Sequence, residues 1–145
     1  MKNPSILSVL AISLGLITAT TGYLHADTFT VTTTNISGPG SLPVAIAQAN
    51  GTPGKNQINI SVTGITLGLA LPTITNSVAI TGIATVPSII SGGGILPLFN
   101  FAAGTTNSLS NLVLANGYTT NNGAAISNSS ILSVSSCVIT NHRAS

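Results

Sequence analysis

The sequence predicts an all-β fold in which short strands coil into a stack, a parallel β-helix (solenoid). The first observation is a repeat: residues 109–116 read LSNLVLAN, and 25 residues later residues 134–141 read VSSCVITN. Both segments are apolar at their first, fourth, fifth and sixth places, and both end in Asn. Strand-like repeats of about 20–50 residues are typical of stacked coils. The second observation is a scarcity of hairpin signals: after the one predicted helix, Asn-Gly occurs only at 116–117 and 122–123.

The third observation is the position of Asn116 and Asn141, which stand one repeat apart. A tight corner between strands needs a left-handed backbone, which Asn tolerates better than most residues. Stacked Asn side chains can also hydrogen-bond to one another along a ladder. We therefore expect both residues to form corners in neighbouring coils.

Residues 1–26 are predicted to be a signal peptide. Lys2 gives a positive start, residues 6–17 form an apolar run, and Ala26 offers a small residue before the cut. The run is shorter than the roughly 20 residues that a membrane-spanning helix needs. Cleavage near Gly22 or Ala19 and an uncleaved anchor are the alternatives.

Residues 27–56 are predicted to form an opening strand and a capping helix. Residues 29–32 alternate apolar and polar side chains, and residues 35–40 are rich in turn residues. Ser41 can cap the helix, and Pro43 is tolerated in its first turn. The apolar residues that share one helical face are Leu42, Ala45, Ile46 and Ala49. Such a helix would cover the hydrophobic end of the stack and its unpaired strand edge.

Residues 57–145 are predicted to be β-helix coils, truncated at the C-terminal side. Apolar residues at alternate positions indicate short strands, separated by Gly, Asn, Thr and Pro rather than by helices. The apolar strand positions are Ile58, Ile60, Val62, Ile65, Leu67, Leu69, Leu71, Val78, Ile80, Ile89, Ile90, Phe99, Phe101, Leu112, Leu114, Leu132, Val134, Val138 and Ile139. An antiparallel β-sandwich is the alternative fold.

The charge inventory excludes several function classes. The chain holds three Lys or Arg residues and one acidic residue. Nucleic-acid binding needs several cations to neutralise phosphates, so it is not expected. The single cysteine, Cys137, cannot form an internal disulfide; it aligns with Leu112 and is expected in the core.

No catalytic, cofactor-binding or metal-binding residues are predicted. Polysaccharide-cleaving chemistry needs paired carboxylates or carboxylates that hold calcium, and the mature chain has only Asp27. A serine nucleophile needs a base, and the only mature histidine, His142, lies where the chain end is expected to fray. Cys137 and His142 together are too few for a structural zinc site. Lys55 and Arg143 are interpreted as solvated surface charges.

Two further motifs have structural interpretations. The run at residues 91–94, SGGG, lacks the Lys of a phosphate-binding loop and is expected to form a corner between coils. Phe99, Phe101 and Tyr118 could form a stacking platform for carbohydrate. Phe99 and Phe101 share strand parity, which favours core filling.

The opening segment resembles secreted bacterial right-handed parallel β-helix proteins. Residues 40–46, GSLPVAI, followed by Ala49-Asn50, are similar to that family's opening Gly-Ser-Leu-Arg-x-Ala-Ile and Ala-Asn. Pro43 stands where the family has Arg, so any role of that Arg is lost. The later half is similar to the polymorphic outer-membrane proteins of chlamydia-like bacteria, whose Gly-Gly-Ala-Ile and Phe-x-x-Asn motifs correspond to residues 123–126, GAAI, and 138–141, VITN.

The resemblance implies an exported protein, secreted or held at the cell surface or outer membrane. We expect a non-enzymatic scaffold, the N-terminal part of an adhesin or autotransporter-like protein, with glycans or surface proteins as partners. One alternative is the N-terminal fragment of a β-helix polysaccharide lyase or hydrolase whose catalytic coils are missing. Another is a truncated remnant without function. A complete small protein would have to close its open end by self-association.

Overall fold

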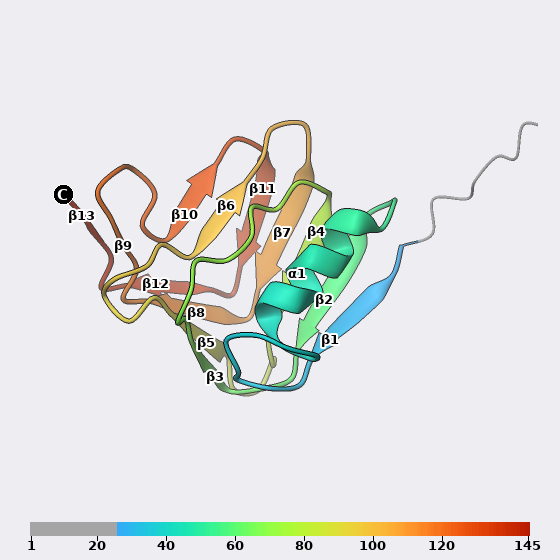
Figure 1. The fold of residues 1–145 in the computed structure, drawn as a ribbon, viewed down its shortest axis with the longest axis horizontal. Coiled ribbons are helices and arrows are strands. Elements are labelled where there is room, and N and C mark those ends of the chain that lie inside the picture. Colours follow the sequence, from blue (N-terminus) through green and yellow to red (C-terminus); the bar gives the residue numbers. More distant parts are fainter. Residues whose placement is uncertain (1–25) are drawn as a thin grey trace, which may run out of the picture.

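The computed structural model describes residues 26–145, which form a solenoid of stacked strands (Figure 1). The predicted signal peptide lies outside these residues except for Ala26, its last residue. Every strand pair in the described part of the chain is parallel. The predicted all-β parallel β-helix is therefore confirmed, and the antiparallel sandwich is wrong.

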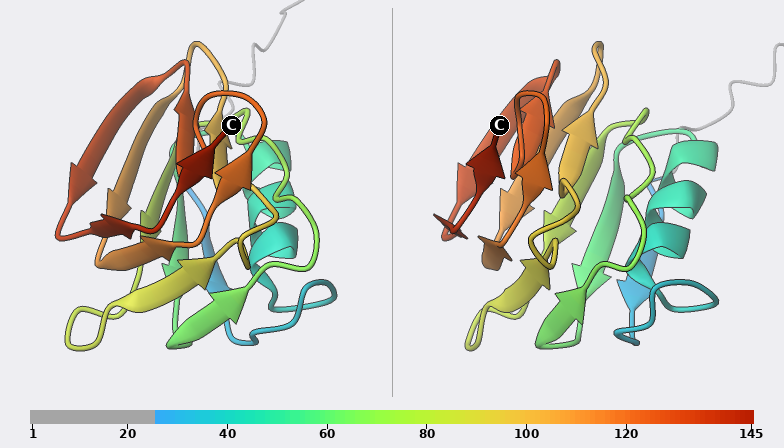
Figure 2. Two further views of the ribbon diagram at one scale, coloured as in Figure 1. Left: turned by 90° about the vertical axis from the view of Figure 1, so that its left-hand side faces the viewer. Right: turned by 60° about the vertical axis from the view of Figure 1, so that its left-hand side comes forward.

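The solenoid has five coils, each of which adds one strand to a five-stranded sheet of order β1-β2-β4-β7-β11. These strands are β1 (Thr28–Val31), β2 (Asn56–Ile60), β4 (Val78–Thr81), β7 (Thr106–Ser110) and β11 (Ile131–Ser135). A four-stranded sheet, β12-β8-β5-β3, forms a second side: β3 (Gly64–Thr66), β5 (Ser88–Ser91), β8 (Leu112–Ala115) and β12 (Val138–Thr140). Two short sheets complete the coils: β6 (Phe99–Phe101) with β10 (Ile126–Asn128), and β9 (Tyr118–Thr119) with β13 (Arg143–Ala144). Figure 2 shows the coils side by side, from the blue and cyan end to the red end.

The predicted 25-residue repeat is the register of the last two coils. Leu109 pairs with Val134 and Val113 pairs with Val138, each 25 residues apart. Earlier coils differ in length, since Ile80 is the register partner of Leu109 at a separation of 29 residues. Inserted loop residues in these coils explain why the sequence shows only one clear repeat.

Two columns of left-handed residues turn the corners of these coils. Asn116 has a φ of 51° and Asn141 has a φ of 56°, which confirms the predicted corners. The side-chain amide of Asn116 donates a hydrogen bond to Ser91 Oγ at 3.2 Å, not to Asn141 as the expected ladder required. A second column, Asn111 with a φ of 55° and Ser136 with a φ of 50°, also lies 25 residues apart and was not predicted.

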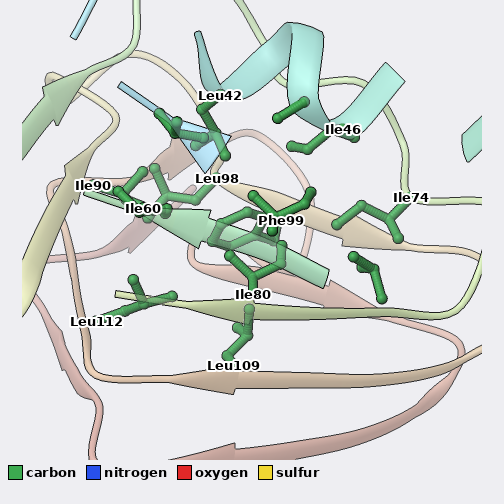
Figure 3. Packing of buried hydrophobic residues seen from close by; sticks show 14 of the residues in the cluster. Leu42, Ile46, Ile60, Ile74, Ile80, Ile90, Leu98, Phe99, Leu109 and Leu112 are labelled. Atoms are coloured by element: carbon green, nitrogen blue, oxygen red, sulfur yellow. The ribbon is translucent and has the colours of Figure 1, made fainter. Parts of the chain in front are cut away.

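The inside of the coils is filled by apolar side chains from every coil and from the helix. Fully buried members include Phe99 and Phe101, whose ring centroids lie 5.9 Å apart, so their predicted core role is confirmed. Figure 3 shows helix residues Leu42 and Ile46 facing the strand residues of this core. The largest fully buried side chains are Phe99, Phe101, Leu42, Ile46, Ile58, Ile65, Ile74, Ile80, Ile90, Leu109, Leu112 and Leu114.

Helix α1 (Leu42–Gly51) covers one end of the stack beside β1 and β2 (Figures 1 and 2). Its buried residues are the four predicted from their spacing: Leu42, Ala45, Ile46 and Ala49. Ser41 stands at the N-cap, but its hydroxyl donates to Gly38 O at 2.7 Å and caps no helical N–H, so the predicted side-chain cap is wrong. The far end of α1 is fixed to the second coil, where Asn50 donates to Thr73 O and accepts from Thr75 N.

The alternation of apolar and other residues after Gly64 continues in the sequence beyond the end of the strand that forms there. Strand β3 ends at Thr66, and Leu69 is 63% exposed rather than inside the coil. Its neighbour Leu67 is still buried. The chain therefore leaves the strand before the alternating pattern ends.

The other end of the stack is formed by the fifth coil, and no helix of residues 26–145 covers it. Val134 is 43% exposed and Ile139 is 51% exposed, although their register partners Leu109 and Leu114 are fully buried. Cys137 faces the core as predicted but is only half-buried. We call Leu132, Val134, Cys137 and Ile139 the open-end residues.

Candidate functional site

A polar cleft lies at the corner where β8 and β12 turn into β9 and β13. Its volume is about 450 Å³, and its walls come from two adjacent coils and from the loop after β5. The lining residues are Gly94, Asn116, Gly117, Tyr118, Asn141 and Arg143. We call this the corner cleft.

The repeat itself places the four side chains of the corner cleft. Tyr118 and Arg143 are register partners in the parallel pair β9–β13, so they project from neighbouring strands in the same direction. Asn116 and Asn141 precede them by two residues at the two stacked corners. The result is a two-by-two array, with an amide and a phenol on the fourth coil and an amide and a guanidinium on the fifth.

His142 holds the fifth coil in place beneath this array. Its Nδ1 accepts from the Gly117 N–H at 3.0 Å, and its Nε2–H donates to the Leu114 carbonyl at 2.9 Å. The imidazole thus bridges two backbone groups of the previous coil, and the backbone bond from Arg143 N to Gly117 O at 2.9 Å adds a further link. His142 lies in the segment where fraying is expected, and both of its ring nitrogens are hydrogen-bonded to the fourth coil.

Gly117 is required where it stands. A Cβ on Gly117 would collide with the carbonyl oxygen of Ala124 and with Nδ1 of His142. The close approach of the imidazole to the previous coil therefore depends on a residue without a side chain. The absence of a side chain at Gly117 lets the His142 ring and the Ala124 carbonyl lie against the backbone next to the corner cleft.

The array has open hydrogen-bonding capacity. Tyr118 Oη lies 3.0 Å from Ser145 Oγ at the cleft edge, and the Asn116 amide contacts Ser91. Asn141 and Arg143 are exposed. Amide groups donate and accept, the phenol does both, and the guanidinium only donates.

A second cleft, of about 360 Å³, lies on the side formed by β6 and β10. Its polar wall includes Thr73, Asn100, Asn121 and Asn122. Gly123 has a φ of 86° and turns the loop that leads to β10. The cleft shares the β9 segment with the corner cleft through Thr119, so both clefts lie near one polar loop.

The glycine run at residues 91–94 and Cys137 have structural roles. In the loop after β5, Gly93 has a φ of 62° and Gly94 a φ of 75°, which confirms the corner predicted for residues 91–94. The Cys137 thiol donates to Ser135 O at 3.2 Å. Within residues 26–145, no three His, Cys, Asp or Glu residues group together where they could hold a metal ion.

Sequence reasoning missed the pairing of Tyr118 with Arg143. The signal was present, because the two residues stand 25 positions apart, the spacing of the repeat. The sequence groups Tyr118 with Phe99 and Phe101 as a possible stacking platform, but the structure places both phenylalanines in the core. Arg143, expected as a solvated surface charge, is exposed and also lines the corner cleft.

The geometry alone defines the class of protein. The chain is a β-solenoid protein with a helix over one end. A scan of protein-family models and searches for similar curated sequences and solved structures gave no match. In the part of the chain that the structure describes, no helix is both long and apolar enough to cross a membrane.

Proposed function

We propose that this protein is an exported, non-enzymatic β-solenoid scaffold that works as an adhesin-type binder of glycans at the cell surface. The corner cleft is the observation that carries the proposal. It combines an aromatic ring, two amides and one cation on rigidly stacked strands. Such groups bind hydroxyl-rich ligands by stacking and by hydrogen bonds.

The distribution of polar groups supports binding rather than catalysis. Asp27, the one acidic side chain of the chain, precedes β1 in the first coil, at the far end of the five-stranded sheet from the fifth coil. General acid–base cleavage of a glycosidic bond needs two carboxyl groups about 5–10 Å apart. A polysaccharide lyase or hydrolase would need those groups from elsewhere, so it is the second candidate function.

Export is part of the proposal and rests on residues 1–26, with their positive start and apolar run. Secretion followed by retention at the cell or outer-membrane surface agrees with the resemblance to surface β-helix proteins.

Glycan binding is tested with purified protein on a panel of immobilised oligosaccharides. We expect Tyr118→Ala to weaken binding about tenfold and Tyr118→Phe to weaken it less, because the ring face is kept. Val86→Ala, an exposed change on the loop before β5, is the matched control and should bind like the parent. Absence of binding to every glycan, or equal binding by Tyr118→Ala, contradicts the proposal. Release of reducing ends or unsaturated sugars contradicts its non-enzymatic part.

We also propose self-association of two copies through the open-end residues. Strands β11 and β12 are the edge strands of their sheets, and Val134 and Ile139 expose apolar surface that belongs inside a coil. Edge strands are usually protected by Lys, Pro or bulges. Residues 126–141 contain no charged residue and no Pro.

The double variant Val134→Lys, Ile139→Lys should lower the association constant at least tenfold, because four like charges would meet across a two-fold contact. Sedimentation velocity over a concentration series measures the effect. The control is Val86→Lys with Ile95→Lys, at positions 57% and 71% exposed and outside the fifth coil. A parent protein that stays monomeric at millimolar concentration rules out this association.

A further inference from the structure

The corner cleft contains one cationic side chain, Arg143, and no acidic side chain in its lining. Arg143 projects beside Tyr118, and its neighbours in the cleft are neutral. The one carboxylate side chain of the described residues, Asp27, stands just before β1, while Arg143 belongs to the fifth coil. In the five-stranded sheet, β1 of the first coil and β11 of the fifth coil are four strand spacings apart, roughly 19 Å. An anionic ligand would therefore meet the guanidinium of Arg143 and no acidic side chain in the cleft lining.

We infer that the corner cleft binds a sugar residue that carries a carboxylate, with Arg143 pairing with the carboxylate. This inference rests on the proposed glycan binding and names the class of glycan. Arginine presents a planar fork of N–H donors that matches the two oxygens of a carboxylate. A lysine offers only a point charge with rotating donors, so the two residues are not equivalent here.

The remaining groups fit the sugar ring rather than a peptide chain. Asn116 and Asn141 lie at fixed left-handed corners, so their amides are presented from positions that the backbone constrains. Each amide can donate and accept, which suits vicinal hydroxyl groups. Tyr118 supplies a ring face beside them. β8, which leads into this corner, has no free edge for an extended peptide, because it pairs with β5 on one side and with β12 on the other.

The rigidity of the cleft supports its use as a binding site. His142 ties the fifth coil to Gly117 and to Leu114 of the fourth, so Arg143 and Asn141 are held on either side of a fixed residue. Prearranged groups lose less entropy when a ligand binds. A volume of about 450 Å³ lies within the range of about 300–1,000 Å³ that is usual for small-ligand sites.

The test compares trigalacturonic acid with its fully methyl-esterified form, which has the same rings without the charge. Isothermal titration at low salt should show the acid binding about tenfold more tightly than the ester, as for a hydrogen-bonded charge pair. Arg143→Gln should lower the affinity for the acid about tenfold and leave the ester unchanged. Arg143→Lys should recover only part of the loss. Lys55→Gln, which removes a cation just before β2, is the matched control and should leave both affinities unchanged.

Each remaining outcome has a defined meaning. Unfolding curves that match the parent would show that Arg143→Gln has kept the fold. Equal affinity for acid and ester, with loss of both in Tyr118→Ala, overturns the carboxylate inference but leaves glycan binding intact. Binding of neither sugar overturns both. Tighter binding of a triglutamate peptide than of trigalacturonic acid, with the same Arg143 dependence, overturns the sugar and identifies an acidic peptide as ligand.

Discussion

Phe101→Ala is expected to lower the free energy of unfolding by about 3–5 kcal/mol, the usual cost of removing a buried aromatic ring from a packed core. Phe101 is completely buried on β6, between Ile74 of the second coil and Asn128 of the fourth. Its ring stacks beside Phe99 with centroids 5.9 Å apart, an arrangement that adds to the area it buries. The inside of a narrow solenoid has no second layer that could move in to fill the space.

The measurement is urea unfolding followed by circular dichroism in the β-sheet region. Ile95→Ala is the matched control, because Ile95 is 71% exposed and its truncation should change stability by less than about 0.5 kcal/mol. A Phe101→Ala variant as stable as this control would mean that the solenoid interior is loosely packed.

Asn107→Ala is expected to cost about 2–3 kcal/mol, although it removes only a short polar side chain. Asn107 is buried on β7 and joins three coils. Its Oδ1 accepts from Val78 N at 2.9 Å, and its Nδ2 donates to Thr105 Oγ1 at 2.7 Å and to Ser130 Oγ at 3.1 Å. Truncation leaves a buried backbone N–H without its acceptor, and such a group costs about 1–3 kcal/mol in addition to the lost packing.

Asn107→Leu separates these two contributions. Leucine restores the volume beside Leu132, the register partner of residue 107, but supplies no acceptor for the Val78 N–H. Asn107→Leu should therefore recover only part of the unfolding free energy that Asn107→Ala loses. Asn100→Ala is the control, since Asn100 is an exposed asparagine whose side chain donates to Thr73 Oγ1 at 3.2 Å. Parent-like stability of Asn107→Ala would show that water replaces the lost acceptor.

The fold was predictable because the last two coils have equal length. Leu109 and Val134 occupy the same inward position, and Asn116 and Asn141 occupy the same corner, so identical spacing in sequence became identical position in space. The helix was predictable from the face that it buries. These features depend on local periodicity, which a single sequence carries.

Other features depend on contacts that periodicity does not encode. Strand β3 stops at Thr66 although the apolar alternation continues, and in the loop that follows Leu67 is buried while Leu69 is exposed. Ser41 bonds to Gly38 instead of to the helix, a choice between two local partners. Asn107 lies inside the solenoid, although a polar side chain is not expected among the apolar core residues.

In the corner cleft, too, one feature follows from the sequence periodicity and another does not. The 25-residue spacing was enough to place Tyr118 beside Arg143, once applied to residues outside the apolar pattern. The role of His142 was not accessible, because it depends on a Gly117 backbone that leaves room for an imidazole. A contact between a side chain and the backbone of another coil leaves no pattern along the sequence.

The helix over the first coil also sets how large an assembly of this molecule can become. Stacking of solenoids end to end requires two free ends per molecule, and α1 occupies one of them. The contact proposed through the fifth coil would use the same surface on both partners, so it would have two-fold symmetry and close once made. Because the ten-residue helix covers the other end, the proposed assembly would stop at a pair and would not grow into a fibre.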